Sequence, residues 1–213
     1  MNLADLRENY TKGGISIAGM SADPFEQFHE WIKVAHDQKI PDSNAMNLAT
    51  ANCEGIVTSR TVLLKGLIEE KFQFFTNYHS QKARDLAENP HASLTFHWKE
   101  LERQISIRGT VEKTSREVSE AYFATRPYES RLGAWVSESQ SNCIGIRSTL
   151  ESRYAALTAR FPDKNNVPCP DFWGGYQLTP TYLEFWQGRQ GRLHDRLRYL
   201  AKGAKWSLDR LSP

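Results

Sequence analysis

Cysteine is scarce in this 213-residue sequence, and no two cysteines stand close together. The three that occur, Cys53, Cys143 and Cys169, form no C-x-x-C motif. An odd number of widely spaced cysteines argues against a disulfide framework and against a zinc site. The six histidines show no H-E-x-x-H or similar ligand spacing. The sequence therefore predicts no metal centre and favours the reducing cytoplasm.

Long apolar runs and a large net charge are also missing. No run of about 18 apolar residues occurs, so we expect no transmembrane helix. The N-terminal stretch MNLADLRENY has acids early and no apolar core, unlike a secretory signal. The net charge is only +2, so no overall field attracts nucleic acid. We expect neither a membrane nor a nucleic-acid partner, and any anion binding must be local.

The glycine-rich motifs that hold nucleotide phosphates are absent as well. The sequence contains no G-x-x-x-x-G-K-[ST], no G-x-G-x-x-G and no G-x-S-x-G elbow. If the protein binds phosphates, arginine and lysine side chains must hold them, with help from a helix N-terminus.

Hydrophobic periodicity predicts a mainly β protein. Residues 1–22 are polar and contain TKGG, which indicates a mobile arm. Asp23, Pro24 and Glu26 are spaced as in a capping box, and apolar residues recur after them at helical spacing. Further helices are expected over 80–89, 115–126 and 148–161, a loop over 162–175, and strands over 45–52, 55–65, 71–77, 91–98, 103–114, 176–188, 191–199 and 205–211.

The order of these elements predicts the fold class. Most strands follow one another as hairpins and do not alternate strictly with helices, which disfavours a doubly wound parallel sheet. We expect an α+β fold, mainly β, in which an antiparallel Greek-key-like barrel with flanking helices forms one domain over residues 23–213.

Several cations occupy positions suited to anion binding. Arg60 and Lys65 bracket an apolar run; their numbers differ in parity, so a regular strand would place them on opposite faces, where they could serve two anions. Lys82 falls in the first turn of a predicted helix, where it opposes the helix dipole unless an anion is bound. The alternatives are two solvated strand ends and an ordinary surface lysine.

A second group offers hydroxyls beside a cation. Tyr122 and Arg126 are four apart near the end of a predicted helix, and Ser130 follows shortly after. They form either an oxyanion nest or an ordinary helix C-terminus that favours a cation. Trp186, just before a basic stretch, is the best candidate for contact with a flat ligand.

The basic stretch GRLHDRLRY covers residues 191–199. As a strand, it would place Arg192, His194, Arg196 and Arg198 on one face, where like charges repel. Either this face is solvated on an edge strand, or an anion lies against it.

Taken together, segments along nearly the whole chain resemble a known family. They are LRENYTKGG (6–14), RTVLLK (60–65), FFTN with SQKA (74–83), LERQ (101–104), RP through GAWVS (126–137), FWGGY (172–176), EFWQG with RLHDR (184–196) and the terminal DRLSP. This set, in this order, resembles the pyridoxine/pyridoxamine 5'-phosphate oxidases. The resemblance implies a split barrel and a homodimer with FMN in the cleft between subunits. It also implies oxidation of pyridoxamine 5'-phosphate and pyridoxine 5'-phosphate to pyridoxal 5'-phosphate, with O2 giving H2O2 and the amine giving NH3.

The resemblance also assigns roles by position. FMN contacts would be Arg60, Thr61, Val62, Leu63, Leu64, Lys65, Phe75, Thr76, Gln81, Lys82, Gln104, Gln140, Ser141, Trp186 and Arg196. Substrate contacts would be Arg7 and Tyr10 in the arm, the phosphate-holding set Lys65, Tyr122, Arg126 and Ser130, and the catalytic pair Arg192 and His194 at the substrate ring. His194 would either orient the substrate or assist proton movement, and Arg198 receives no role.

Two departures from the family pattern affect these assignments. The family usually has arginine where this chain has Gln81, so one phosphate contact is neutral here. The stretch WVSESQS is one residue longer than usual, which shifts the placement of Gln140 and Ser141 by up to one position. Alternative functions are another split-barrel flavin reductase or oxidase, and a non-catalytic binder of FMN or pyridoxal phosphate.

Overall fold

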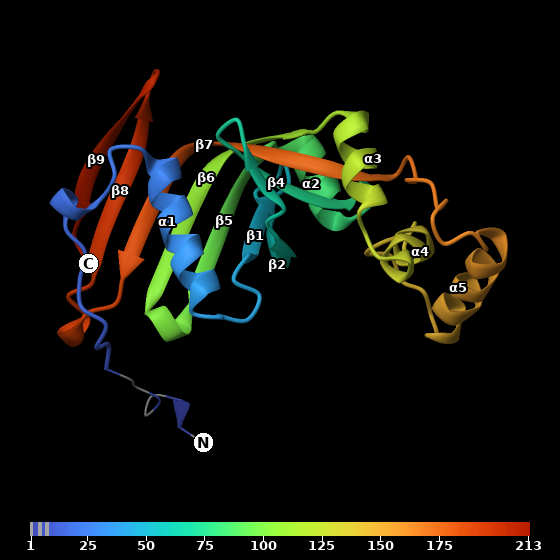
Figure 1. Ribbon diagram of the computed structural model, residues 1–213, viewed down its shortest axis with the longest axis horizontal. Coiled ribbons are helices and arrows are strands. Elements are labelled where there is room, and N and C mark those ends of the chain that lie inside the picture. The colour runs from blue at the N-terminus through green and yellow to red at the C-terminus, as the bar shows by residue number, and fades with distance from the viewer. Residues whose placement is uncertain (1, 4–5, 7–8) are drawn as a thin grey trace.

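An antiparallel, partly closed barrel forms the body of the protein (Figure 1). The computed structural model describes residues 2–3, 6 and 9–213. Within them nine strands follow the order β2-β1-β5-β6-β7-β4-β3, with β8 added to β7 and β9 to β8. The strands are β1 (Ala45–Ala51), β2 (Val57–Leu63), β3 (Gly66–Ile68), β4 (Lys71–Asn77), β5 (His91–Trp98), β6 (Arg103–Lys113), β7 (Trp173–Gln187), β8 (Asp195–Lys202) and β9 (Lys205–Leu211). The predicted fold class, α+β and mainly β, is confirmed.

Strand β7 changes partners along its length. It pairs with β6 over residues 176–187, with β4 over residues 173–178 and with β8 over residues 182–187. The register against β6 shifts between Arg108 and Gly109, opposite Pro180, which has no N–H to donate. A Cβ on Gly109 would lie 2.0 Å from the carbonyl oxygen of Thr179. Only glycine therefore allows the close approach at which β7 leaves β4 and joins β8.

Helix α1 (Pro24–Asp37) lies across one face of the sheet (Figure 1) and fills the main core. Phe28 and Trp31 are almost fully buried, and their rings contact those of Phe72 and Phe185 edge-on, with centroids 5.0 Å apart in both pairs. Edge-on contact is a favoured geometry for aromatic rings. This packing holds the helix against the barrel.

The start of α1 differs in detail from the predicted capping box. Asp23 accepts the N–H of Phe25 at 2.7 Å, as expected of an N-cap. The carboxylate of Glu26 accepts instead from the hydroxyl of Ser21, and Ser21 in turn accepts the N–H of Asp23. The Ser21 hydroxyl thus bridges the two acidic residues: it donates to the side chain of Glu26 and accepts from the backbone of Asp23.

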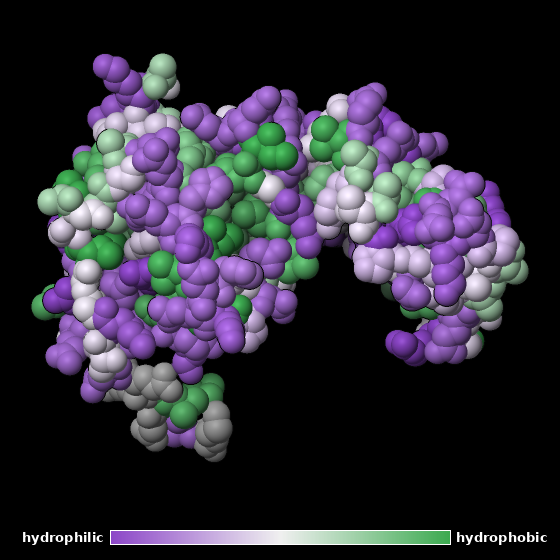
Figure 2. Space-filling view, viewed as in Figure 1, coloured by the Kyte–Doolittle hydropathy of each residue, from purple (hydrophilic) through white to green (hydrophobic). Residues whose placement is uncertain are grey.

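A helical lobe extends from one end of the barrel. It comprises α3 (Arg116–Ala124), α4 (Tyr128–Val136) and α5 (Ser148–Arg160), while α2 (Gln81–Glu88) lies against the barrel itself. Figure 2 shows the lobe joined to the barrel above and separated from it below by an open hollow. The lobe has its own small core around Phe123, Leu132 and Trp173. No helix in the described ranges has the length and hydropathy needed to cross a membrane.

Three sequence-based expectations about element bounds were wrong. Helix α4 follows Pro127 directly, whereas no helix was expected there, because proline can also begin a helix. Strand β7 begins at Trp173, inside the expected loop 162–175. The expected strand over 55–65 runs only from Val57 to Leu63, and the regular strand is interrupted at residues 64 and 65 before β3. The parity argument for Arg60 and Lys65 therefore fails, since no regular strand joins them.

The stretch 191–199 is not one strand either. Gly191 and Arg192 have φ values of 64° and 62°, inside a short 3₁₀ turn (Gln190–Arg192), and β8 starts only at Asp195. This left-handed backbone breaks the alternation. Arg192 and His194 consequently do not continue the face that carries Arg196 and Arg198.

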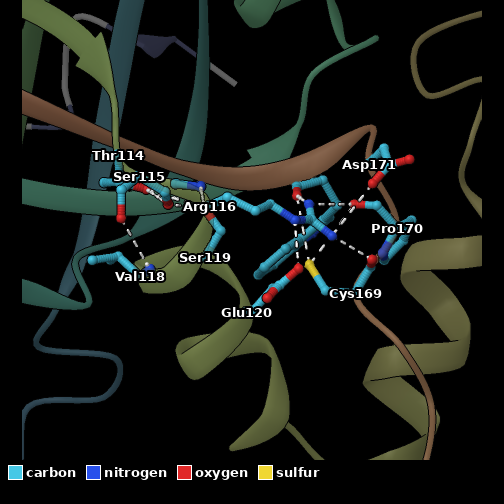
Figure 3. A network of polar contacts seen from close by, with 11 residues as sticks. Thr114, Ser115, Arg116, Val118, Ser119, Glu120, Cys169, Pro170 and Asp171 are labelled. Atoms are coloured by element: carbon cyan, nitrogen blue, oxygen red, sulfur yellow. Dashed lines mark hydrogen bonds and ion pairs between the residues drawn. The ribbon is translucent and has the colours of Figure 1, made fainter.

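Arg116, at the start of α3, fastens the lobe to the first residue of β7 (Figure 3). Its guanidinium donates to the carbonyl oxygens of Cys169, Pro170 and Trp173, the last two at 3.0 and 3.3 Å. Its Nε donates to Glu120 at 2.7 Å. One side chain thus satisfies three carbonyls of the loop that leads into β7.

We expect Arg116→Ala to lower the free energy of unfolding by about 2 kcal/mol, the scale of hydrogen bonds from a charged donor. Urea unfolding measures this change. Arg153→Ala, which removes an exposed arginine of α5, is the control and should leave stability unchanged. Equal stability of the two variants would contradict a fastening role for Arg116.

Candidate active site

A cavity of about 710 Å³ opens between the β2 edge of the barrel and the helical lobe. It collects most of the predicted site residues, from β2, β4, α2, α3, α4 and the segment after α4. Those that line it are Arg60, Thr61, Val62, Leu63, Lys65, Phe75, Thr76, Gln81, Lys82, Tyr122, Arg126, Ser130, Gln140 and Ser141, together with Thr125, Pro127 and Trp173, which sequence reasoning missed. Leu64 does not line it, because its side chain packs in the main core.

The lining of this cavity is strongly cationic. Arg60, Lys65, Lys82 and Arg126 contribute four positive charges, and the lining residues, all within the described part of the chain, include no carboxylate. Arg60 and Lys65 thus share one cavity, contrary to the expectation that they face opposite sides. Such an excess of one charge is unfavourable unless an anion enters.

At one end of the cavity Lys82 is buried. Its ammonium donates to the hydroxyl of Thr76 at 3.1 Å. Burial, aided by the nearby charge of Arg60 and opposed by that of Asp85, lowers the pKa of Lys82 to about 8. Burial also lowers the pKa of Arg60. The negative charge near Lys82 and Arg60 therefore does not balance their two positive charges.

Asp85 is the carboxylate beside these cations, and its oxygens already accept hydrogen bonds from neighbouring side chains. It accepts from the hydroxyls of Thr50 and Thr58 at 2.6 and 2.7 Å and from the amide of Gln81 at 2.7 Å. Burial alone would raise the pKa of Asp85, but these hydrogen bonds and Arg60, whose nitrogen lies 3.8 Å away, hold it below its usual value. One carboxylate thus serves the buried Lys82 and the half-buried Arg60, which leaves a net positive end suited to phosphate.

Gln81, where the family usually has arginine, is occupied by protein contacts. Besides its bond to Asp85, its side-chain oxygen accepts from Arg84 at 2.8 Å. Its backbone N–H donates to the hydroxyl of Ser141 at 3.2 Å. Gln140 presents a buried side-chain oxygen that has no hydrogen-bond partner. Both residues of the lengthened stretch therefore reach the cavity at their predicted numbers.

The other end of the cavity is a stack of aromatic rings topped by an arginine. The rings of Phe75 and Tyr122 stack with centroids 4.0 Å apart, and Trp173 continues the stack 5.6 Å from Phe75. The guanidinium carbon of Arg126 lies 4.7 Å from the Trp173 ring. Its Nη1 is buried without a partner, and burial lowers its pKa. Ser130, in the first turn of α4, lines the same cavity.

A second cluster lies at the far end of the barrel, around a separate cavity of about 560 Å³. Arg192, His194 and Tyr10 line this cavity. The His194 ring lies 4.7 Å from that of Trp186 and 5.2 Å from that of Tyr10. Its Nδ1 accepts the backbone N–H of Arg189 at 3.1 Å. The neutral ring therefore carries its proton on Nε2, which leaves Nε2 as a donor.

Trp186 is flanked by two other predicted cofactor contacts. It pairs with Gln104 on β6 and with Arg196 on β8, so the three residues lie side by side across three strands. Arg196 donates to both oxygens of the buried Glu184, at 2.7 and 3.0 Å. This carboxylate raises the pKa of Arg196. Gln104 donates to Ser106 at 3.2 Å.

The basic face of β8 fits neither of the two expectations, a solvated face or a face that only a bound anion neutralises. Arg196 has Glu184 as partner, and Arg198 donates to Asp209 at 3.0 Å. Carboxylates of neighbouring strands therefore offset the like charges that the sequence places together. Arg7, a predicted substrate contact, lies outside the described residues.

The two clusters do not meet within one chain. Trp173 and Trp186 lie at and near the two ends of β7, which at about 3.3 Å per residue puts roughly 40 Å of extended strand between them. Figure 1 likewise shows β8 and the lobe helices at opposite ends of the molecule. The predicted site residues thus fall into two half-sites: a cationic cavity and a ring cluster around Trp186 and His194.

Two protein-family models match most of the chain. Residues 32–160 match the model described as pyridoxamine 5'-phosphate oxidase, and residues 173–213 match that of the pyridoxine 5'-phosphate oxidase C-terminal dimerisation region. The chain belongs to the pyridoxamine 5'-phosphate oxidase family. The dimerisation region covers β7 to β9 and so carries most of the ring cluster.

Individual relatives agree with this membership. The chain is 53% identical to the pyridoxine/pyridoxamine 5'-phosphate oxidase of Paraburkholderia phymatum and 51% identical to that of Burkholderia cenocepacia, each over 99% of both chains. Among solved structures, it is similar to PhzG from Burkholderia lata 383 in complex with tetrahydrophenazine-1-carboxylic acid. That match has a TM-score of 0.86 and 27% identity, over 94% of this chain and 100% of that one. An FMN-binding protein from Nostoc punctiforme shares the fold, with a TM-score of 0.72 and 16% identity, over 91% of this chain and 100% of that one.

The buried charge of Lys82 predicts a pH dependence of stability in the ligand-free protein. Its folded pKa of about 8 lies below the ordinary 10.5, so the unfolded chain binds more protons between these values and stability rises with pH there. Between pH 8 and 10 the rise should be about 2 kcal/mol. Urea unfolding between pH 8 and 10 should show that Lys82→Met flattens it, while Lys205→Met, at an exposed lysine, does not. An unchanged rise in Lys82→Met would contradict the assignment.

Proposed function

We propose that the protein oxidises pyridoxamine 5'-phosphate and pyridoxine 5'-phosphate to pyridoxal 5'-phosphate, with bound FMN and with O2 as acceptor. The observation that carries the proposal is the cationic cavity, which has four positive charges, no lining carboxylate and an unpartnered Arg126 nitrogen. Two phosphates, one from the cofactor and one from the substrate, match this charge. The family membership of the chain agrees with a phosphate-bearing cofactor and with a phosphate-bearing substrate.

The end of the cavity near Arg60 and Lys82 fits the phosphate of FMN. Both cations are held in place from behind, by Asp85 and by the hydroxyls of Thr50 and Thr76. The edge strand β2 exposes Thr61, Val62 and Leu63 to the same space. FMN bound there would supply the redox chemistry, namely hydride acceptance from the 4' carbon of the substrate and reoxidation by O2 to H2O2; hydrolysis of the imine from the amine substrate would release NH3.

The opposite end would hold the substrate phosphate. Arg126 offers a free buried donor, and Lys65, Tyr122 and Ser130 add a cation and two hydroxyls. Arg126 and Tyr122 are held in place before the substrate arrives, because Arg126 rests on Trp173 and Tyr122 stacks on Phe75. Such preorganisation orients the 4' carbon without further reordering of the protein.

The ring cluster would hold the other face of the substrate. Arg192 would clamp the substrate ring. His194 would act as a hydrogen-bond donor through Nε2, since its Nδ1 is occupied by the Arg189 amide. We therefore assign His194 to orientation of the substrate rather than to removal of a proton.

A homodimer would join the two half-sites. The cationic cavity of one subunit would receive Trp186, Arg192, His194 and Arg196 from the partner, with FMN between them. The support for this arrangement is the separation of the clusters along β7 and the match of β7 to β9 to a dimerisation region.

The first test is spectroscopic. The purified protein should be yellow with about one FMN per chain, and pyridoxamine 5'-phosphate should bleach it without oxygen. Pyridoxamine lacking the phosphate should react about 10⁴-fold less efficiently, because the cations of the cavity are then left unpaired. Arg126→Ala should reduce this preference, and Arg153→Ala should not. A protein that takes up no FMN, or that reduces it only with a tricyclic carboxylic acid, would contradict the proposal.

The second test concerns the shared site. Arg126→Ala and Arg192→Ala homodimers should each be nearly inactive. A purified heterodimer of the two variants should recover about half of the wild-type activity, because one of its two symmetric sites then lacks both substitutions. If each site were built within one chain, the heterodimer would stay as inactive as its parents.

A further inference from the structure

Carboxylates of the barrel fasten the N-terminal arm. Both oxygens of Glu102 accept the backbone N–H of Thr11, at 2.9 and 2.8 Å, and one also accepts the N–H of Lys12 at 2.9 Å. Three residues further on, Asp195 accepts the N–H of Ile15 at 3.1 Å. Hydrogen bonds to an ionised acceptor are among the stronger ones in proteins.

Glu102 occupies a backbone position that glycine or asparagine would fill more easily. Its φ and ψ are 54° and 38°, the left-handed region, at the tight turn between β5 and β6. Its carbonyl oxygen accepts the N–H of Gly188 at 2.8 Å and the side-chain amide of Gln187 at 3.1 Å. Main-chain and side-chain atoms of one residue thus join the end of β7 to the arm.

The residue just before the fastened segment is Tyr10. Its ring meets those of Trp186 and His194 edge-on, at 5.5 and 5.2 Å. A Cβ added at Gly188 would lie 2.4 Å from this ring, so the arm lies directly on the backbone there. Tyr10 thereby forms one wall of the cavity that contains Arg192 and His194.

We propose that Glu102 is a positioning residue: its carboxylate latches the arm at Thr11 and Lys12 and so holds Tyr10 against His194. This inference rests on the proposed function and adds to it a residue that touches neither substrate nor cofactor. The strained backbone of Glu102 fits this role, because the fold itself has no need of a glutamate at that turn. The ring of His194 is then held on one side by the Arg189 amide and on the other by Tyr10.

Two substitutions at Glu102 separate the latch from the fold. Glu102→Gln keeps the length of the side chain but loses its charge. Glu102→Gly removes the side chain and suits the left-handed backbone, so its melting temperature should equal or exceed that of the wild type. Glu100→Gln, at an exposed carboxylate of the same turn, is the matched control. Gly188→Ala displaces Tyr10 by direct contact and leaves the latch intact.

The first readout is independent of flavin and activity. Trypsin cleavage between Lys12 and Gly13, followed by mass spectrometry, needs an undocked arm. Both Glu102 variants should be cleaved about tenfold faster than the wild type, the factor for loss of one charge-assisted hydrogen bond. Glu100→Gln should not differ from the wild type. Unchanged cleavage in both Glu102 variants would overturn the latch.

The second readout is kinetic. Both Glu102 variants and Gly188→Ala should keep their FMN content but show a higher KM for pyridoxamine 5'-phosphate and a lower kcat/KM. Faster cleavage with unchanged kcat/KM would overturn the positioning role. If the wild type oxidises no pyridoxamine 5'-phosphate, the proposed function fails by itself, and the cleavage experiment still decides whether Glu102 latches the arm.

Discussion

The change of partners along β7 is the constraint on which the rest of the structure depends. One end of this strand pairs with β4 and brings Trp173 to the cationic cavity, while the other end pairs with β8 and presents Trp186 to the ring cluster. The switch needs the close backbone contact at Gly109 and the missing N–H of Pro180. Because β6 pairs with β7 over residues 176–187 and β4 with residues 173–178, both half-sites are tied to one strand that is paired along its whole length.

The cationic cavity is electrostatically unfavourable without a ligand. Lys82, which is buried, and Arg60, which is half-buried, lie beside a single carboxylate, and Arg126 keeps an unpartnered nitrogen. Each of these groups lost hydration on folding without gaining a full partner. An entering phosphate supplies the missing negative charge without requiring the side chains to move, because hydroxyls and aromatic rings already hold them.

The ring cluster follows the opposite principle. Two arginines on its β8 strand have carboxylate partners, Glu184 for Arg196 and Asp209 for Arg198, so these two charges are balanced before any ligand arrives. The flat rings, the Nε2 donor of His194 and the guanidinium of Arg192 are what the cluster offers to a ligand. The cavity thus suits charged phosphates, and the cluster suits a planar ring. The cofactor and the substrate of the proposed reaction each have a phosphate and a planar ring.

The sequence alone determined the fold class, the amphipathic helix α1, the residue types at the site and the family that they resemble, because these depend on local spacing and on motifs in a fixed order. Tertiary structure decided where the residues lie. Arg60 and Lys65 share a cavity because β2 stops at Leu63, and Arg196 faces Glu184 because β8 pairs with β7 in one register. Helix α4 and the early start of β7 depend on packing around Trp173. The division into two half-sites follows from the length of β7, since no local pattern records how far apart two distant motifs lie in the folded chain.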